Sequence, residues 1–155
     1  MLGRPANLKK EQSRMAPKKK AWKWCSRYCR LRDALDYCKE HRIDLHQFAR
    51  TEDIIGACCT CGVVKSWIWM DAGHFISRGT GGVSGVYFDE RNINLQCKRC
   101  NGFKQGAAQE YREFIGKKYG EDMVEILRKK HFILPDMKNL AMKATEEYYK
   151  QKYKD

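Results

Sequence analysis

Cys58-Cys59-Thr60-Cys61 and Cys97-Lys98-Arg99-Cys100 are the two segments that decide the fold, and thirty-five residues separate them. Each segment contains a Cys-x-x-Cys motif, a tight turn that presents two thiolates to one ion. Two such turns complete the tetrahedral shell of a structural zinc ion and leave no open position for catalysis. The sequence therefore predicts one structural Zn²⁺ ion bound by Cys58, Cys61, Cys97 and Cys100.

The remaining cysteines leave alternatives open. Cys59 gives a competing Cys-x-Cys register with Cys61, but the Cys-x-x-Cys spacing matches the second motif and is preferred. A redox role like that of thioredoxin is disfavoured, because neither motif lies between a strand and a helix of a recognisable βαβ unit. Cys25, Cys29 and Cys38 lie on a helical stripe and are expected to be ordinary core residues.

Positive charge is concentrated near the N-terminus. The chain has 155 residues and a net charge of +12, and its first thirty residues contain ten Lys or Arg against one Glu. Such a segment attracts nucleic acid by releasing condensed counterions. We expect residues 1–20 to be a disordered basic arm that binds DNA, partly through Lys18, Lys19 and Lys20. A solvated tail that only aids solubility is the alternative.

The hydropathy pattern excludes a membrane protein. No apolar segment approaches the roughly 20 residues of a transmembrane helix, and the basic N-terminus has no apolar signal region. We therefore expect a cytoplasmic protein. Residues 21–155 are expected to form a single domain.

Helical patterns flank a β-rich centre. Apolar residues recur every three or four positions from Ala21 to about Arg50, which predicts an amphipathic helix, or two. Trp22 and Trp24, at its start, could stack on nucleic-acid bases or pack on the domain, and packing is the preferred interpretation. The aromatic and β-branched segments 63–70 and 74–77 predict a hairpin.

Helix signals return after Cys100. Tyr111, Phe114 and Ile115 precede Gly120 and a second apolar group, and a last charged helix is expected around Met137 to Lys152. The pattern is that of an α+β protein.

Three segments of this chain carry a family resemblance. They are Ala72-Gly73-His74-Phe75, Phe88-Asp89-Glu90-Arg91-Asn92 and Gln96-Cys97-Lys98-Arg99-Cys100-Asn101. Together they resemble the HNH, or ββα-metal, nuclease motif in its zinc-stapled form, and more narrowly the phage NinG/Rap recombination endonucleases. The resemblance covers residues 55–105 closely. It implies a zinc-stapled, treble-clef-like ββα-metal core with helices on either side.

The resemblance also implies roles for individual residues. His74 would be the general base that activates water, a task suited to an imidazole whose ordinary pKa is about 6.5. Asn92 would bridge the hairpin and fix the loop that presents His74. Asn101 would offer an oxygen ligand to a catalytic Mg²⁺ or Mn²⁺ ion.

The second ligand of the catalytic ion is less clear from the sequence. Related proteins often have an acid directly before the histidine, where this chain has Gly73. Asp71 shares a strand face with that position and is our predicted ligand, with Asp89 and Glu90 as alternatives.

Two further cations belong to the predicted site. Arg78 and Lys104 are expected to hold phosphates, although either would also be ordinary as a solvated surface charge.

The resemblance implies a metal-dependent endonuclease that hydrolyses phosphodiester bonds of DNA. Within the NinG/Rap family it further implies branched recombination intermediates, such as Holliday junctions or D-loops, and paired cuts by a homodimer. A general HNH enzyme that nicks or cuts duplex DNA is the nearest alternative. A non-catalytic zinc module that binds DNA is a second, and a zinc-bound redox or scaffold protein ranks last.

Overall fold

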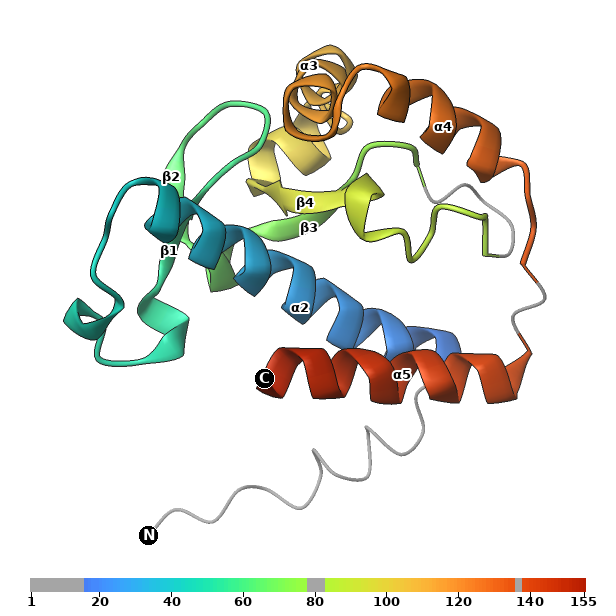
Figure 1. Ribbon diagram of the computed structural model, residues 1–155, viewed down its shortest axis with the longest axis horizontal. Helices are drawn as coiled ribbons and strands as arrows, with labels where there is room; N and C mark the ends of the chain where they lie inside the picture. The colour runs from blue at the N-terminus through green and yellow to red at the C-terminus, as the bar shows by residue number, and fades with distance from the viewer. Residues whose placement is uncertain (1–15, 78–82, 136–137) are drawn as a thin grey trace, which may run out of the picture.

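The computed structural model describes residues 16–77, 83–135 and 138–155 (Figure 1). Within these ranges the main elements, in chain order, are α2 (Pro17–Glu40), β1 (Ile55–Ala57), β2 (Val64–Ser66), β3 (Asp71–His74), β4 (Ile93–Gln96), a π-helical turn (Arg99–Phe103), α3 (Ala108–Tyr119), α4 (Asp122–His131) and α5 (Asn139–Lys154). Short 3₁₀ turns over Leu45–Gln47, Thr51–Asp53, Trp67–Trp69 and Glu90–Asn92 complete the connections. The fold is mixed α+β, as the sequence predicts.

The first helix differs from its expected bounds at both ends. It begins at Pro17, whose fixed φ suits the first helical position, so residues 17–20 of the expected arm are helical. It ends at Glu40 and not near Arg50, because Arg42 adopts a φ of 53°. The N–H of Ile43 then donates to the carbonyl of Cys38 at 2.8 Å and directs the chain back toward the core.

The strands form two antiparallel pairs. β1 pairs with β2 through the turn that contains the first Cys-x-x-Cys motif. β3 pairs with β4, with Asp71 opposite Gln96 and His74 opposite Ile93. The hairpin expected from segments 63–70 and 74–77 was therefore wrong, because each segment belongs to a different pair.

Small residues let α2 lie close to both strand pairs. Its buried positions are Ala21, Cys25, Cys29, Ala34 and Cys38, which confirms the three cysteines as core residues. In Figure 1 the β3–β4 pair lies between α2 and α5 on one side and α3 and α4 on the other. α5 packs against α2, and the rings of Tyr28 and Tyr149 lie 5.7 Å apart.

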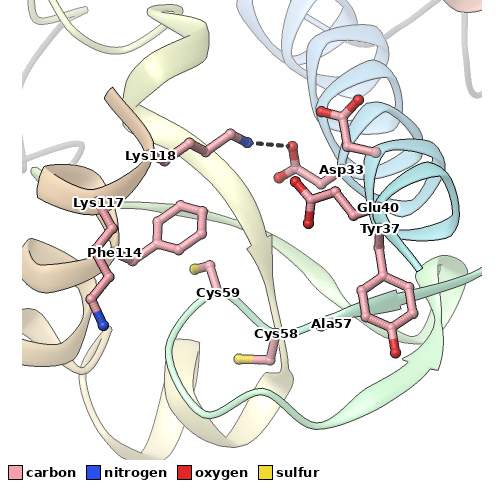
Figure 2. A pocket seen from close by; sticks show the side chains of 10 residues that line it. Asp33, Tyr37, Glu40, Ala57, Cys58, Cys59, Phe114, Lys117 and Lys118 are labelled. Carbon is pink, nitrogen blue, oxygen red and sulfur yellow. Dashed lines mark hydrogen bonds and ion pairs between the residues drawn. The ribbon is translucent and has the colours of Figure 1, made fainter. Parts of the chain in front are cut away.

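A buried carboxylate joins three of these elements. Asp33 of α2 accepts the N–H of Leu95 in β4 at 2.7 Å and pairs with Arg32 at 2.8 Å and with Lys118 of α3 at 3.2 Å. Its side chain is only 9% exposed. Figure 2 shows the Lys118 to Asp33 contact beside the cysteine turn. The hydrogen bond from Leu95 thus ties β4, the strand that leads into the second Cys-x-x-Cys motif, to α2.

Candidate metal centre and active site

The four predicted zinc ligands converge. The sulfur atoms of Cys58, Cys61, Cys97 and Cys100 all lie within 4.8 Å of one another, and those of Cys61 and Cys97 are 3.8 Å apart. A tetrahedral ion with Zn–S bonds of about 2.3 Å requires sulfur atoms separated by about 3.8 Å. The cluster can therefore hold one structural metal such as zinc.

Backbone hydrogen bonds shape the two turns that carry these thiols. The N–H of Gly62 donates to the Cys58 carbonyl at 2.9 Å, and Gly62 has a φ of 75°, which favours glycine. In the second turn the N–H of Asn101 donates to the Cys97 carbonyl at 2.9 Å. The N–H of Cys59 donates to the Leu95 carbonyl at 2.8 Å and ties the first turn to β4. Backbone hydrogen bonds thus help to define the shape of each Cys-x-x-Cys turn.

The electrostatics of the thiols favour a cation. Burial raises the pKa of Cys58, but hydrogen bonds from the backbone of Cys97 and Cys61 and from the Thr60 hydroxyl outweigh it and lower that pKa to about 6. Burial and the neighbouring thiols raise the pKa of Cys61 to about 12. Adjacent thiolates repel one another unless a positive ion balances them, which a divalent metal does.

Cys59 faces away from this cluster. Figure 2 shows its side chain on the side of Phe114, apart from that of Cys58. Cys59 packs against the core formed by Val86, Tyr111, Ile115, Val124 and Leu127. Burial raises its pKa well above the ordinary value, so the thiol stays neutral. The Cys-x-x-Cys register preferred from the sequence therefore matches the geometry.

His74 lies at the end of β3 in an aromatic setting. Its Nε2 is 2.9 Å from the carbonyl oxygen of Tyr87. The ring of Trp22, in α2, stacks on the His74 ring with centroids 4.7 Å apart and planes 26° apart. Because a carbonyl only accepts, this hydrogen bond requires a proton on Nε2, and the lone pair of the neutral ring is then on Nδ1.

Asn92 is fully buried and hydrogen-bonds to the segments on both sides of residues 78–82. Its side-chain oxygen accepts the N–H of Ile76 at 2.8 Å, and its amide donates to the carbonyls of Ile76 and Val86, both at 3.1 Å. The backbone N–H of Phe75 donates to the Asn92 carbonyl at 2.9 Å. Asn92 thereby holds the residues that directly follow His74.

Asp71 and Asn101, predicted as ligands of a catalytic ion, are in contact. The Asn101 amide donates to one Asp71 oxygen at 3.0 Å, and Lys98 contacts the other at 2.8 Å. Burial raises the pKa of Asp71, but Lys98, Asn101 and the nearby Arg30 together lower it below its usual range. The carboxylate is therefore ionised at neutral pH.

A cavity of about 360 Å³ opens beside this pair. Its lining consists of Trp22, Ser26, Arg30, Met70, Asp71, Ala72 and Asn101. Trp22 thus contacts the His74 ring and also borders the space in front of Asp71 and Asn101.

The two alternative acids hold structural ion pairs. Asp89 is bound by Arg91 and by Lys130 of α4, each at 2.7 Å. Burial raises the pKa of Asp89, but these hydrogen bonds outweigh it and lower that pKa to about 2. Glu90 pairs with Lys152 of α5 at 2.8 Å.

Glycine at position 73 has a steric reason. A Cβ added there would lie 3.0 Å from the Cβ of Gln96 and still closer to its side-chain oxygen. Gln96 is fully buried, and its amide donates to the Gly106 carbonyl at 2.8 Å. An acid directly before His74 would not fit this packing.

The predicted DNA contacts fall in different places. Lys18, Lys19 and Lys20 lie in the first turns of α2, and the Lys18 ammonium lies 4.7 Å from the centre of the Tyr87 ring. Lys104 is exposed after the π-helical turn. Arg78 lies outside the described residues.

The family model for the Bacteriophage Lambda NinG protein matches residues 3–155. The chain belongs to the NinG family. It is 34% identical over 122 residues to Protein ninG of Salmonella phage P22, which is 77% of this chain and 57% of that protein. It is 32% identical over 123 residues to Protein ninG of Escherichia phage lambda, again 77% of this chain and 56% of the relative.

The chain spans about half the length of the curated NinG relatives that it matches. No solved structure is significantly similar to it. Among residues 16–77, 83–135 and 138–155, no helix combines the length and the apolar character needed to cross a bilayer.

In this member of the NinG family, sequence reasoning missed the contribution of α2 to the site. Trp22 and Trp24 pack on the domain as expected, and Trp24 lies 5.7 Å from the ring of Tyr153. The stacking of Trp22 on His74, and the place of Ser26 and Arg30 at the cavity, were not expected. The signal in the sequence was the spacing of Trp22, Ser26 and Arg30, because residues four positions apart lie on the same face of a helix.

Proposed function

We propose that the chain is a divalent-metal-dependent DNA endonuclease of the HNH type. The observation that carries the proposal is the arrangement on the β3–β4 pair. An oriented histidine lies at one end of β3 and a carboxylate–amide pair at the other, beside the four-cysteine cluster. A protein that only binds DNA needs cations and has no use for an oriented base.

In this proposal His74 is the general base. The Tyr87 carbonyl accepts the Nε2 proton of the neutral ring and orients it, and Nδ1 is the basic nitrogen of this tautomer that would take a proton from the attacking water. Asn92 restrains residues 75 and 76 and so limits the movement of the ring. The His74 side chain then needs little reorganisation when the substrate arrives.

Asp71 and Asn101 would hold the catalytic ion. A carboxylate oxygen and an amide oxygen are hard ligands, and Mg²⁺ commonly takes one or two protein carboxylates while water and substrate phosphate fill its remaining positions. A half-turn of the Asn101 amide exchanges its nitrogen for its oxygen beside Asp71. When bound, Mg²⁺ or Mn²⁺ would neutralise the scissile phosphate and the leaving oxygen.

The NinG resemblance supplies the proposed substrate. We infer that the enzyme acts on branched recombination intermediates and cuts them as a homodimer, with DNA as its partner. A general endonuclease for duplex DNA, with the same site, is the alternative.

The test measures cleavage of a labelled four-way junction and of its matched linear duplex, with Mg²⁺ and without any divalent ion. Asp71→Asn is compared with Asp53→Asn, because Asp53 is an exposed carboxylate whose ion pair is with Arg50. Zinc content is measured for each protein.

We expect Mg²⁺-dependent cutting that is faster on the junction. Asp71→Asn should lower it about a hundredfold, a typical loss when a group that stabilises transition-state charge is removed, and Asp53→Asn should not change it. Equal cutting of junction and duplex would favour the general endonuclease. DNA binding without cutting by the zinc-loaded native chain would favour the non-catalytic zinc module.

A further inference from the structure

One face of α2 lies along the proposed site. Lys18, Trp22, Ser26 and Arg30 are four residues apart in sequence, so they follow one another along the helix. Lys18 lies over the Tyr87 ring and Trp22 on His74, while Ser26 and Arg30 line the cavity beside Asp71. We call these four residues the α2 strip.

The other faces of α2 have different partners. Ala21, Cys25 and Cys29 are fully buried. Trp24 and Tyr28 pack against α5, and the guanidinium of Arg27 lies 5.4 Å from the Trp24 ring. The strip is therefore a distinct surface, and cations on the same helix but on another face provide matched controls.

Arg30 is held in place at the cavity wall. Its Nε donates to the Ser26 carbonyl at 3.2 Å and one terminal nitrogen donates to the Met70 carbonyl at 3.1 Å. These bonds use two of the five N–H donors of a guanidinium, so the group retains donors for an anion. Burial and the positive charge of Arg27 lower the pKa of Arg30. The Asp71 carboxylate opposes this shift, and the guanidinium keeps N–H donors at the cavity wall for a phosphate.

The cavity has the size and chemistry for part of a DNA backbone. It measures about 360 Å³, and its polar lining residues are Ser26, Arg30, Asp71 and Asn101. A fixed guanidinium recognises phosphate by paired hydrogen bonds, and a hydroxyl adds another donor. Lys18 lies about three helical turns from Arg30, so the strip places a second positive charge where a neighbouring part of the same DNA strand could lie.

We propose that the α2 strip is one wall of the DNA-binding cleft, where Arg30 and Ser26 bind the scissile-strand phosphate, Lys18 binds a neighbouring phosphate and Trp22 positions the His74 ring. The inference rests on the proposed nuclease function. Trp22 is a positioning residue, because it acts through His74 and lies next to the cavity.

Two pairs of variants test the phosphate contacts. Arg30→Gln is compared with Arg27→Gln, and Lys18→Gln with Lys23→Gln, so each pair removes the same charge from nearby turns of α2. The Lys23 ammonium lies 5.9 Å from the Trp24 ring and so belongs to the face that packs against α5. Affinity for a labelled 20-base-pair duplex is measured by fluorescence anisotropy without divalent ions, and thermal unfolding is followed for every variant. The lysine pair keeps the test decisive if loss of the Met70 contact unfolds Arg30→Gln.

The strip variants should bind DNA about tenfold more weakly, as expected for loss of a charge-assisted hydrogen bond. Their controls should change affinity less than about twofold, the effect of net charge alone. Equal losses within both pairs would overturn the inference.

Trp22 is tested by rescue. Trp22→Leu should lower the single-turnover cleavage rate about tenfold with little change in DNA affinity, because a misplaced base slows the chemical step and not binding. Trp22→Phe keeps a stacking ring and should restore most of the rate. Trp24→Leu, which loses an aromatic side chain on the α5 face, is the control. If Trp22→Leu leaves the cleavage rate unchanged, or if Trp22→Phe does not restore it, Trp22 does not position His74.

The outcomes separate the two proposals. If the native chain cuts DNA and strip and control variants behave alike, the α2 wall is wrong and the nuclease stands. If the native chain cuts no DNA with Mg²⁺ or Mn²⁺, the nuclease is wrong and the α2 inference falls with it.

Discussion

At position 73 a side chain of the paired strand explains why the residue is glycine. Gln96 lies opposite Asp71, and its buried amide also donates to the Thr60 hydroxyl at 3.2 Å. These bonds tie Gln96 to the first cysteine turn, so it has little freedom to make room for a side chain at Gly73. The carboxylate of this strand lies two residues earlier, at Asp71.

Gly73→Ala should lower the free energy of unfolding by about 1–3 kcal/mol, because overpacking a filled site forces neighbours out of their preferred rotamers. Chemical denaturation of the zinc-loaded protein measures the loss. Gly102→Ala is the control, since nothing lies within 4 Å of a Cβ added at that exposed position.

A double variant checks the cause. Combined with Gln96→Ala, Gly73→Ala should cost much less than it does alone, because the colliding side chain is gone. Additive losses would mean that contact with Gln96 is not the reason for glycine at this position.

At the scale of the elements, the four-cysteine cluster lies where the two strand pairs meet. Cys58 and Cys61 lie in the turn between β1 and β2, while Cys97 and Cys100 follow β4. Strands of three and four residues bury little apolar surface. A metal bound by all four thiols would therefore supply much of the free energy that holds them together.

Replacing any one of the four cysteines with Ser should abolish zinc binding and the folded state, whereas Cys59→Ala should retain one zinc ion per chain. Elemental analysis gives the zinc content and circular dichroism the fold. Zinc loss from Cys59→Ala, with retention by Cys58→Ser, would contradict the assigned register.

The elements also mark how far the sequence could be interpreted. The four-cysteine cluster and the helices after Cys100 could be predicted, because each depends on a local pattern, the Cys-x-x-Cys spacing in one case and the apolar period in the other. The pairing of β3 with β4 could not, because its register depends on distant contacts such as Asp33 with the Leu95 N–H. The stacking of Trp22 on His74 is equally non-local, since fifty-two positions separate the two residues.

At the scale of the whole molecule, two groups of positive charges would contribute to the proposed DNA binding. Residues 1–15 contain four Lys or Arg and one Glu, and Lys18 begins the α2 strip. Because α2 begins at Pro17 and Ala21 is fully buried, a deletion that tests the arm should stop at residue 15.

Deletion of residues 1–15 should weaken DNA binding and reduce the slope of log affinity against log salt by about 1–3, because each phosphate contact contributes about 0.9. Thermal unfolding should stay the same. Affinity titrations at several salt concentrations measure the slope. An unchanged slope would assign the electrostatic binding to residues 16–155 alone.

The measurement that tests the central claim most directly is single-turnover cleavage of DNA by native protein and by His74→Ala, both with one zinc ion per chain and with Mg²⁺. The account predicts that His74→Ala binds DNA with native affinity and cuts it at least about a hundredfold more slowly, because the general base is lost. Native rates of cutting by His74→Ala would contradict the account, since the base would then have to be another group.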